Sequence, residues 1–384
     1  MDIMKGSETV SVNMMGLSDV CVLFQESPIY VDPYGDLDIA ISRNEKLRNF
    51  RVSSAMMRRA SPVWRAMLTN GFKQLLPGAD PITFPEDDVL TFFIVLLAVH
   101  LRFSEIPYQL DSDLFGSVCT LCVKYDCLVV MQPFFDRWKY GLSFSTTWGY
   151  NPQEWVSWAW IGWSTGDARI IRRVKEYYIL RCRTNTANEL MDTENGIVEE
   201  ELPPGLVRII HESRRRILTG FVTKCHNMVE QWGETAYNGS PQCGSRIRRS
   251  SPCPIDEEQC DTLYFGHLVR SLRVWKLWPG QIDKLVSNLE ARTISRLSPR
   301  LKKIVAPRYH EHDSNHAKGK HIGCGWTAQL HRAVEDELEE GARKEIDAHV
   351  PELDAQQLKF YPKEISVSKF QKAEDFKGIQ VFGR

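Results

Sequence analysis

The chain has 384 residues, of which 43% are hydrophobic and 10% aromatic, enough to bury a substantial core over about two domains. This composition excludes a chain that is disordered throughout. Its 48 Lys and Arg residues nearly balance its 49 Asp and Glu residues, and the resulting formal net charge of -1 favours protein partners over nucleic acid or an anionic membrane.

The amino-terminal segment does not read as a secretory signal. It carries Asp2, Lys5 and Glu8 and lacks an apolar core ahead of a small-residue cleavage site. The longest apolar run, residues 89–101, is well short of the roughly twenty residues that a membrane span needs. These features predict an intracellular protein of the cytoplasm, the nucleus or both, with reduced cysteines and no membrane partner.

Alternating apolar residues predict a β-hairpin near the start of the chain. Leu37, Ile39 and Ile41 share one side of an extended segment, and Phe50 and Val52 repeat the pattern after a polar turn. Because side chains alternate between the two faces of a strand, these five residues are expected on one buried face.

Helices are predicted to follow the hairpin. Ser53 and Ser54 offer cap hydroxyls for a first helix, and Ser61-Pro62 restarts it. A third strand at 82–84 leads into an acidic cap and a buried helix over 89–101, and two amphipathic helices follow from residue 111 to about 140. Residues 17–142 are therefore expected to form an α+β domain, a small sheet capped by helices.

The rest of the chain is predicted to be mainly α-helical. Residues 143–300 form a helical region with an exposed acidic loop near 191–203, and residues 301–384 contain a His-rich loop and charged C-terminal helices. Five tryptophans between Trp148 and Trp163 are expected in core packing rather than in stacking on bases or sugars.

Several short motifs occur in an order and spacing that resemble the BTB/POZ proteins abundant in filamentous fungi. The resemblance covers about residues 20–142 and extends more loosely into the Trp-rich helices. No single motif is specific, and the set carries the likeness. The motifs are Gly35-Asp36-Leu37, Phe50-Arg51-Val52-Ser53-Ser54, Ala60-Ser61-Pro62-Val63-Trp64, Phe84-Pro85-Glu86-Asp87-Asp88, and Lys124-Tyr125-Asp126-Cys127 followed by Trp138.

The resemblance implies a non-enzymatic domain used for homotypic pairing, as a homodimer, or for docking other proteins. Some relatives link substrates to cullin ubiquitin ligases and others act in transcription. This sequence has no recognisable kelch, zinc-finger or MATH-like partner domain, which leaves the choice between an adaptor and a nuclear regulator open.

Phe103-Ser104-Glu105 resembles the element with which cullin-docking members place an apolar anchor and a carboxylate at the interface. Phe103 and Glu105 are therefore candidate partner-binding residues. In the alternative interpretation, Phe103 only caps the preceding helix and Glu105 is solvated.

A structural zinc site is the candidate cofactor. Soft thiolates and an imidazole suit zinc, and a closed four-ligand site would tie a loop-rich region to the helices without an open coordination position. Core packing is the alternative for each thiol. The proposed ligands are Cys253, Cys260, His321 and Cys324, with Cys225, His226 and Cys243 as possible substitutes, whereas Cys119, Cys122 and Cys127 fall within a helical pattern and are expected in the core.

Two basic clusters are candidate nuclear-targeting or phosphate-contacting segments. Arg214-Arg215-Arg216 falls in a helical pattern beside Glu212, so a solvated helix face is expected. The second cluster, residues 246–249, lies in a Ser- and Pro-containing segment and is the better targeting candidate. No G-x-S-x-G elbow, phosphate-binding glycine loop or H-E-x-x-H motif is present, so an enzyme is not predicted.

Overall fold

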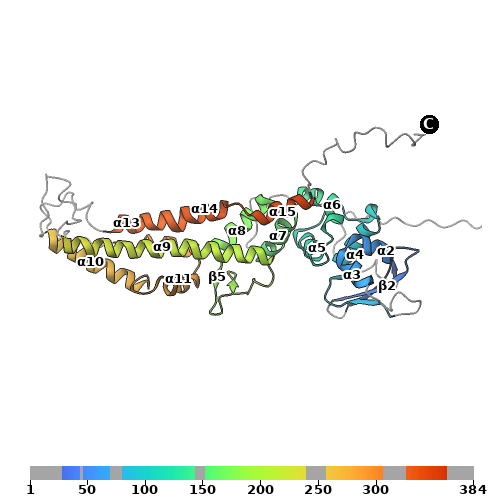
Figure 1. Ribbon diagram of the computed structural model, residues 1–384, viewed down its shortest axis with the longest axis horizontal. Coiled ribbons are helices and arrows are strands. Elements are labelled where there is room, and N and C mark those ends of the chain that lie inside the picture. The colour runs from blue at the N-terminus through green and yellow to red at the C-terminus, as the bar shows by residue number, and fades with distance from the viewer. Residues whose placement is uncertain are drawn as a thin grey trace, which may run out of the picture. The chain divides into compact units, whose positions relative to one another are not determined.

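The computed structural model describes residues 28–43, 46–69, 80–142, 152–238, 257–305 and 326–360. The chain divides into two compact units (Figure 1). Unit 1 contains residues 1–171 together with 350–384, and unit 2 contains residues 172–349. The chain therefore leaves unit 1 within a helix and returns to it near its end.

Unit 1 is built on a four-stranded sheet in the order β1-β3-β2-β4. The strands are β1 (Ile29–Tyr30), β2 (Leu37–Arg43), β3 (Lys46–Val52) and β4 (Ile82–Phe84). The pair β2 and β3 is an antiparallel hairpin, while β1 pairs with β3 and β4 with β2 in parallel. The sequence predicts β2, β3 and β4. It does not predict β1, because two residues are too few to show an alternating pattern.

The hairpin register places the predicted apolar residues on one face. Leu37 lies opposite Val52 and Ile39 lies opposite Phe50, and each of these side chains is at most 1% exposed. Ile41, two residues further along β2, is fully buried as well. The period-two prediction is therefore confirmed, since a shift of one residue would have turned every one of these side chains outward.

Helices cover the buried side of this sheet. They are α2 (Ser54–Ala60), α3 (Pro62–Thr69) and α4 (Val89–Val99). The Ser53 side chain accepts a hydrogen bond from the first turn of α2, and the Asp88 carboxylate caps α4 in the same way. The Ser61 hydroxyl accepts from the Trp64 N–H at 3.0 Å and caps α3 likewise. Local capping signals read from the sequence thus fix where all three helices begin.

An aromatic cluster joins these helices to the sheet. The ring of Trp64 on α3 lies 5.7 Å from that of Phe92 on α4 and 5.2 Å from that of Tyr125. Phe84 of β4 lies 4.9 Å from Phe92. The Tyr125 hydroxyl donates to the buried carboxylate of Asp87, so this hydroxyl is satisfied inside the core.

Four further helices of unit 1 lie within the described residues. They are α5 (Ser112–Lys124), α6 (Leu128–Gly141), α7 (Pro152–Thr165) and α15 (Pro351–Phe360). The α5 helix packs closely against α7, and α15 contacts both α6 and α7. The end of the described chain thus packs on helices that precede it by about two hundred residues.

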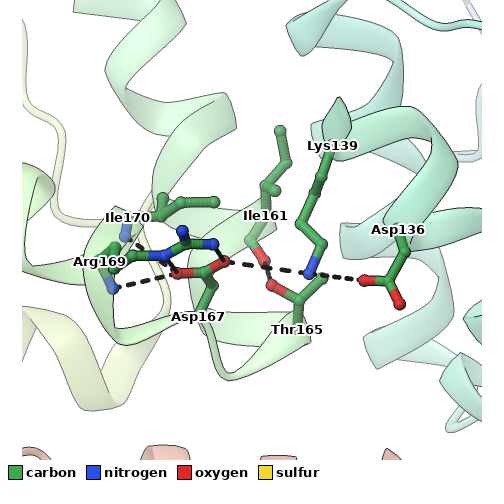
Figure 2. Close-up of polar contacts among 7 residues, drawn as sticks. All are labelled: Asp136, Lys139, Ile161, Thr165, Asp167, Arg169 and Ile170. Carbon is green, nitrogen blue, oxygen red and sulfur yellow. Dashed lines mark hydrogen bonds and ion pairs between the residues drawn. The ribbon is translucent and has the colours of Figure 1, made fainter. Parts of the chain in front are cut away.

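Asp167 makes the polar contacts at the corner between α7 and α8 (Ala168–Arg181), as Figure 2 shows. The Asp167 carboxylate accepts a hydrogen bond from the backbone N–H of Arg169 at 3.0 Å, so it caps the first turn of α8. Lys139 of α6 lies 3.9 Å from the same carboxylate and 3.0 Å from that of Asp136. These contacts hold the corner to α6.

Unit 2 is organised along one long helix, α9 (Pro204–Asn238), which contacts α10, α11, α13, η5 and α14. The other helices that the structure describes in this unit are the remainder of α8, α10 (Glu257–Val274), α11 (Ile282–Glu290), α12 (Ile294–Leu301), α13 (Thr327–Ala333), the π-helical η5 (Val334–Gly341) and α14 (Ala342–Asp347).

The acidic stretch predicted as an exposed loop follows a small hairpin. Strands β5 (Arg183–Thr184) and β6 (Leu190–Met191) pair antiparallel, and Met191 also bridges to Ile197. Val198 and Leu202, further along, are 3% and 1% exposed. Two apolar side chains therefore anchor a stretch whose composition is otherwise polar.

Within the described ranges, every helix is too short or too polar to cross a membrane.

Candidate functional site

The predicted docking element forms a short 3-10 helix, η3 (Phe103–Glu105), shortly after α4. The side chain of Phe103 is half exposed, at 50%, and its ring lies 5.7 Å from that of Phe134 on α6. Phe103 therefore rests one edge on the protein and presents the rest to solvent. A residue that only sealed the end of α4 would be expected to be more deeply covered.

Leu101, at the end of α4, has a backbone conformation that is uncommon for its residue type. Its φ is 62°, in the left-handed region. The helix ends in the two hydrogen bonds of a Schellman motif, from the Leu101 N–H to the Ala98 carbonyl and from the Arg102 N–H to the Leu97 carbonyl. Glycine usually occupies this position. A leucine costs about 1–2 kcal/mol there, and its side chain is 64% exposed. Neither the strain nor the exposure is explained by packing.

Arg102 ties η3 to the first strand of the sheet. Its guanidinium donates to both carboxylate oxygens of Glu105 at 2.5 Å, and Nη1 donates to the Tyr30 carbonyl at 3.0 Å. The pair with Glu105 is partly exposed on both sides, so it contributes about 1 kcal/mol or less. The Glu105 carboxylate can therefore exchange this partner for another donor at small cost.

A second arginine orders the other side of η3. The Arg137 guanidinium lies 4.9 Å from the ring of Tyr108 and 5.3 Å from that of Phe134, and it donates to the Pro107 carbonyl at 3.0 Å. Tyr108 is nevertheless 61% exposed. The cation holds one face of this ring and leaves the rest open to solvent.

These contacts run without a break from β1 to α6 and define what we call the η3 surface. It combines exposed apolar side chains with arginines, the residue types that contribute most to protein–protein binding. The sequence identified only Phe103 and Glu105, because contacts between distant segments bring Tyr30 and Arg137 to the same surface. The η3 surface consists of Tyr30, Leu101, Phe103 and Tyr108 with Arg102, Glu105 and Arg137.

The proposed zinc ligands fall largely outside the described residues. Cys253, His321 and Cys324 lie outside them, and Cys260 lies in α10 with a side chain that is not described. The substitute Cys243 also lies outside, whereas Cys225 is fully buried in α9. Among the described side chains, no three His, Cys, Asp or Glu residues gather as a metal site would require. The zinc site therefore stays a prediction.

The other cysteines considered as ligands are core residues. Cys119, Cys122 and Cys127 are each at most 1% exposed, in or next to α5. Burial raises the pKa of the Cys119 and Cys122 thiols, because a thiolate is poorly solvated there. Both groups are held in the neutral form, which binds metal weakly.

The basic cluster on α9 is not the uniform solvated face that its sequence suggests. Arg214 is 1% exposed, and its guanidinium donates to the carbonyls of Ile179, Glu290 and Arg292 at 2.6, 3.2 and 3.0 Å. Arg215, the next residue, does point outward and pairs with Asp283 at 2.9 Å. Arg214 is therefore a buried structural residue of unit 2 that joins α9 to the ends of α8 and α11.

No protein-family model matches the sequence, and no curated protein matches it either.

Proposed function

We propose that this chain is a non-enzymatic protein–protein interaction protein, whose first unit is a BTB/POZ-like domain that docks another protein through the η3 surface. The observation that carries the proposal is Leu101. It holds a strained backbone conformation at the end of α4 and exposes most of its apolar side chain, two local costs that a bound partner would offset.

The immobilisation of the η3 surface supports the same conclusion. Arg102 and Arg137 hold the backbone of β1 and of Pro107, so the neighbouring apolar side chains are presented on fixed supports. A surface that is ordered before binding loses less conformational entropy when a partner docks. The sequence motifs that resemble BTB/POZ proteins agree with this use.

The test compares two double variants of the full-length protein. Replacing Phe103 and Tyr108 with alanine removes two aromatic anchors, while replacing Tyr34 and Tyr140 removes two aromatic rings that are 94% and 93% exposed elsewhere on unit 1. Affinity purification with crosslinking should recover partners with the wild-type protein and the control, and lose them with the η3 variant. Equal recovery by all three proteins would contradict the proposal.

A homodimer is the first partner to examine. Sedimentation velocity of the wild-type protein at micromolar concentration should give a dimer if the η3 surface pairs with itself, and a monomer for the Phe103→Ala, Tyr108→Ala variant. A monomeric wild type would restrict the proposal to heterotypic partners.

A cullin adaptor is the second candidate function. The exposure of Phe103, at 50%, and the weak pairing of Glu105 favour it, because both side chains of the predicted element are available at the surface. A purified cullin amino-terminal region should bind the wild-type protein and bind at least ~10-fold more weakly to a Phe103→Ala, Glu105→Gln variant, corresponding to the loss of about 1.4 kcal/mol or more. Undetectable binding by the wild type would remove this candidate.

A further inference from the structure

The chain as a whole is nearly neutral, but residues 270–303 of unit 2 are not. This segment contains nine Lys and Arg residues against two acidic ones, Asp283 and Glu290. Glu290 is 5% exposed, and Asp283 is paired with Arg215. The overall charge balance therefore hides a region whose exposed side chains carry almost entirely positive charge.

The cations lie on the exposed sides of successive elements. On α12 and the turn after it, Arg296, Arg300 and Lys303 follow one another at spacings of four and three residues, opposite the buried side chains of Ile294 and Leu297. At 1.5 Å of rise per residue, the three are spread over about 10 Å of helix. They form one cationic stripe.

A similar arrangement occurs at the end of α10. Arg270 and Arg273 are exposed and three residues apart, and Lys276 follows in the turn that ends the helix. Figure 1 shows α10 and α11 following one another along α9, and both helices contact α9. We call the whole set the 270–303 basic surface. It comprises Arg270, Arg273, Lys276, Lys284, Arg292, Arg296, Arg300 and Lys303.

The cations of this surface lack the carboxylate partners that other cations of unit 2 have. Among the residues described in the structure, none of the eight forms an ion pair. By contrast, Lys224 pairs with Asp336 at 2.9 Å, Lys302 pairs with Glu339 at 2.8 Å, and Arg216 pairs with a third carboxylate. Eight exposed like charges without counter-charges repel one another and attract anions.

Aromatic side chains are interleaved with these charges. Trp275 and Trp278 are partly exposed at the end of α10, and the Arg292 guanidinium lies 5.8 Å from the ring of Trp275. This contact links the end of α10 to the segment between α11 and α12. Val274 beside them is 73% exposed. A cation and an aromatic ring from two successive segments of the basic surface are therefore in contact.

We propose that the 270–303 basic surface binds the phosphodiester backbone of a nucleic acid. Five of its eight cations are arginines, whose planar guanidinium matches the oxygens of a phosphate. Each cation that contacts a phosphate releases condensed counterions, which drives binding without regard to base sequence. The exposed rings can add stacking with unpaired bases.

An anionic membrane is the weaker match for the same charges. Membrane-surface helices bury a continuous apolar face in the lipid, whereas the exposed side of α12 carries Arg296 and Arg300 and its apolar side chains are buried in unit 2. The exposed apolar side chains beside these cations are Val274 at the end of α10 and Val305 after α12, which do not follow one another along one helix.

The test is fluorescence anisotropy of the full-length protein with a labelled single-stranded RNA and a labelled duplex DNA, each of about twenty nucleotides. Wild-type protein should bind one or both with Kd below about 100 µM at 100 mM salt. The logarithm of the binding constant should fall linearly with the logarithm of salt concentration. Comparing the two oligonucleotides distinguishes a single-stranded RNA from a duplex DNA as the source of the phosphates.

Charge reversal locates the site. Arg296→Glu with Arg300→Glu should weaken binding at least ~10-fold, and the neutral pair Arg296→Gln with Arg300→Gln should weaken it in the same direction with less risk to folding. The control reverses Arg173 and Arg208, exposed arginines of unit 2 that lie outside the surface and are paired with Glu176 and Glu212. Its net charge change is identical, and its affinity should stay within ~2-fold.

Three results would overturn the proposal. One is wild-type protein that binds neither oligonucleotide. Another is an equal loss in the control and the Arg296, Arg300 variants, which would indicate an effect of total charge. The third is binding to phosphatidylserine vesicles in a sedimentation assay without binding to either nucleic acid, which would identify a lipid surface instead.

Discussion

The backbone N–H of Ser53 donates a hydrogen bond to Nε2 of His100 over 3.0 Å. The other ring nitrogen lies 2.9 Å from the Leu96 carbonyl, so the neutral ring carries its proton on Nδ1. This histidine joins the end of α4 to the beginning of α2, directly beside Leu101. A proton on Nε2 would remove the acceptor and leave the Ser53 amide without a partner.

Acidification is therefore expected to loosen this junction. Burial lowers the pKa of His100, and the nearby charge of Arg102 lowers it further. The hydrogen bond to Leu96 and the Asp32 carboxylate raise the pKa, but burial outweighs them. Because the folded-state pKa lies below the ordinary value of 6.5, the contribution to stability is complete above 6.5. It is lost as pH falls from there through the folded-state pKa.

Hydrogen exchange of peptides covering residues 50–57 measures this effect locally. After correction for intrinsic rates, protection should fall between pH 7.5 and 5.0 in the wild-type protein. A His100→Gln variant keeps an acceptor for Ser53 and has no group that titrates in this range, so its protection should stay constant. A wild-type junction that remained equally protected at both pH values would contradict the prediction.

A second prediction separates stability from binding at Leu101. Replacement by asparagine, which tolerates a positive φ, should stabilise unit 1 by about 1 kcal/mol and raise the temperature of unfolding. The same variant should bind partners of the η3 surface more weakly, because the exposed side chain is lost. Calorimetry and the purification experiment measure the two effects on one protein.

Lys276 provides the matched control for this variant. It has a φ of 56° in the same kind of helix end, where Leu277 N–H donates to the Leu272 carbonyl at 2.8 Å. Lys276→Asn should therefore stabilise unit 2 by a similar amount without changing binding at η3. A Leu101→Asn protein that was destabilised, or that bound partners as well as wild type, would show that Leu101 is not a strained residue kept for binding.

The hairpin and the helix starts could be predicted because the interactions that fix them are local. Ile39 and Phe50 are eleven residues apart across one turn, and Asp88 accepts from the backbone of Thr91, three residues away. Periodicity and capping residues report such contacts directly. These signals indicate which side chains face the core without any knowledge of the rest of the chain.

The η3 surface could be predicted only in part because distant contacts assemble it. Arg102 reaches the Tyr30 carbonyl across 72 positions in the chain, and Arg137 reaches Pro107 across 30. Phe103 belongs to a recognisable motif, but no residue near it in the sequence indicates that Tyr30 would lie on the same surface. Leu101 also carried no signal, because its left-handed conformation follows from how α4 ends and leucine is uncommon there.

The buried thiols lead to a third prediction. Burial raises the pKa of Cys182 and of Cys225 to about 12, so the reactive thiolate is roughly a thousandfold scarcer at pH 8 than for an ordinary thiol with a pKa of 9.0. Iodoacetamide at pH 8 should leave both residues unmodified in the folded protein and modify them in urea, as mass spectrometry of tryptic peptides would show. Rapid modification under folding conditions would contradict their burial.

The last prediction compares two adjacent arginines that the sequence does not distinguish. Arg214 donates to three backbone carbonyls at the ends of α8 and α11, inside unit 2, whereas Arg215 forms one exposed ion pair. Arg214→Met keeps an unbranched apolar side chain at this position but leaves those carbonyls without a donor, at a cost of about 3–5 kcal/mol. Arg215→Met should cost about 1 kcal/mol or less. Thermal unfolding followed by near-ultraviolet circular dichroism would rank them, and equal midpoints would show that Arg214 does not support the packing of α8 and α11 on α9.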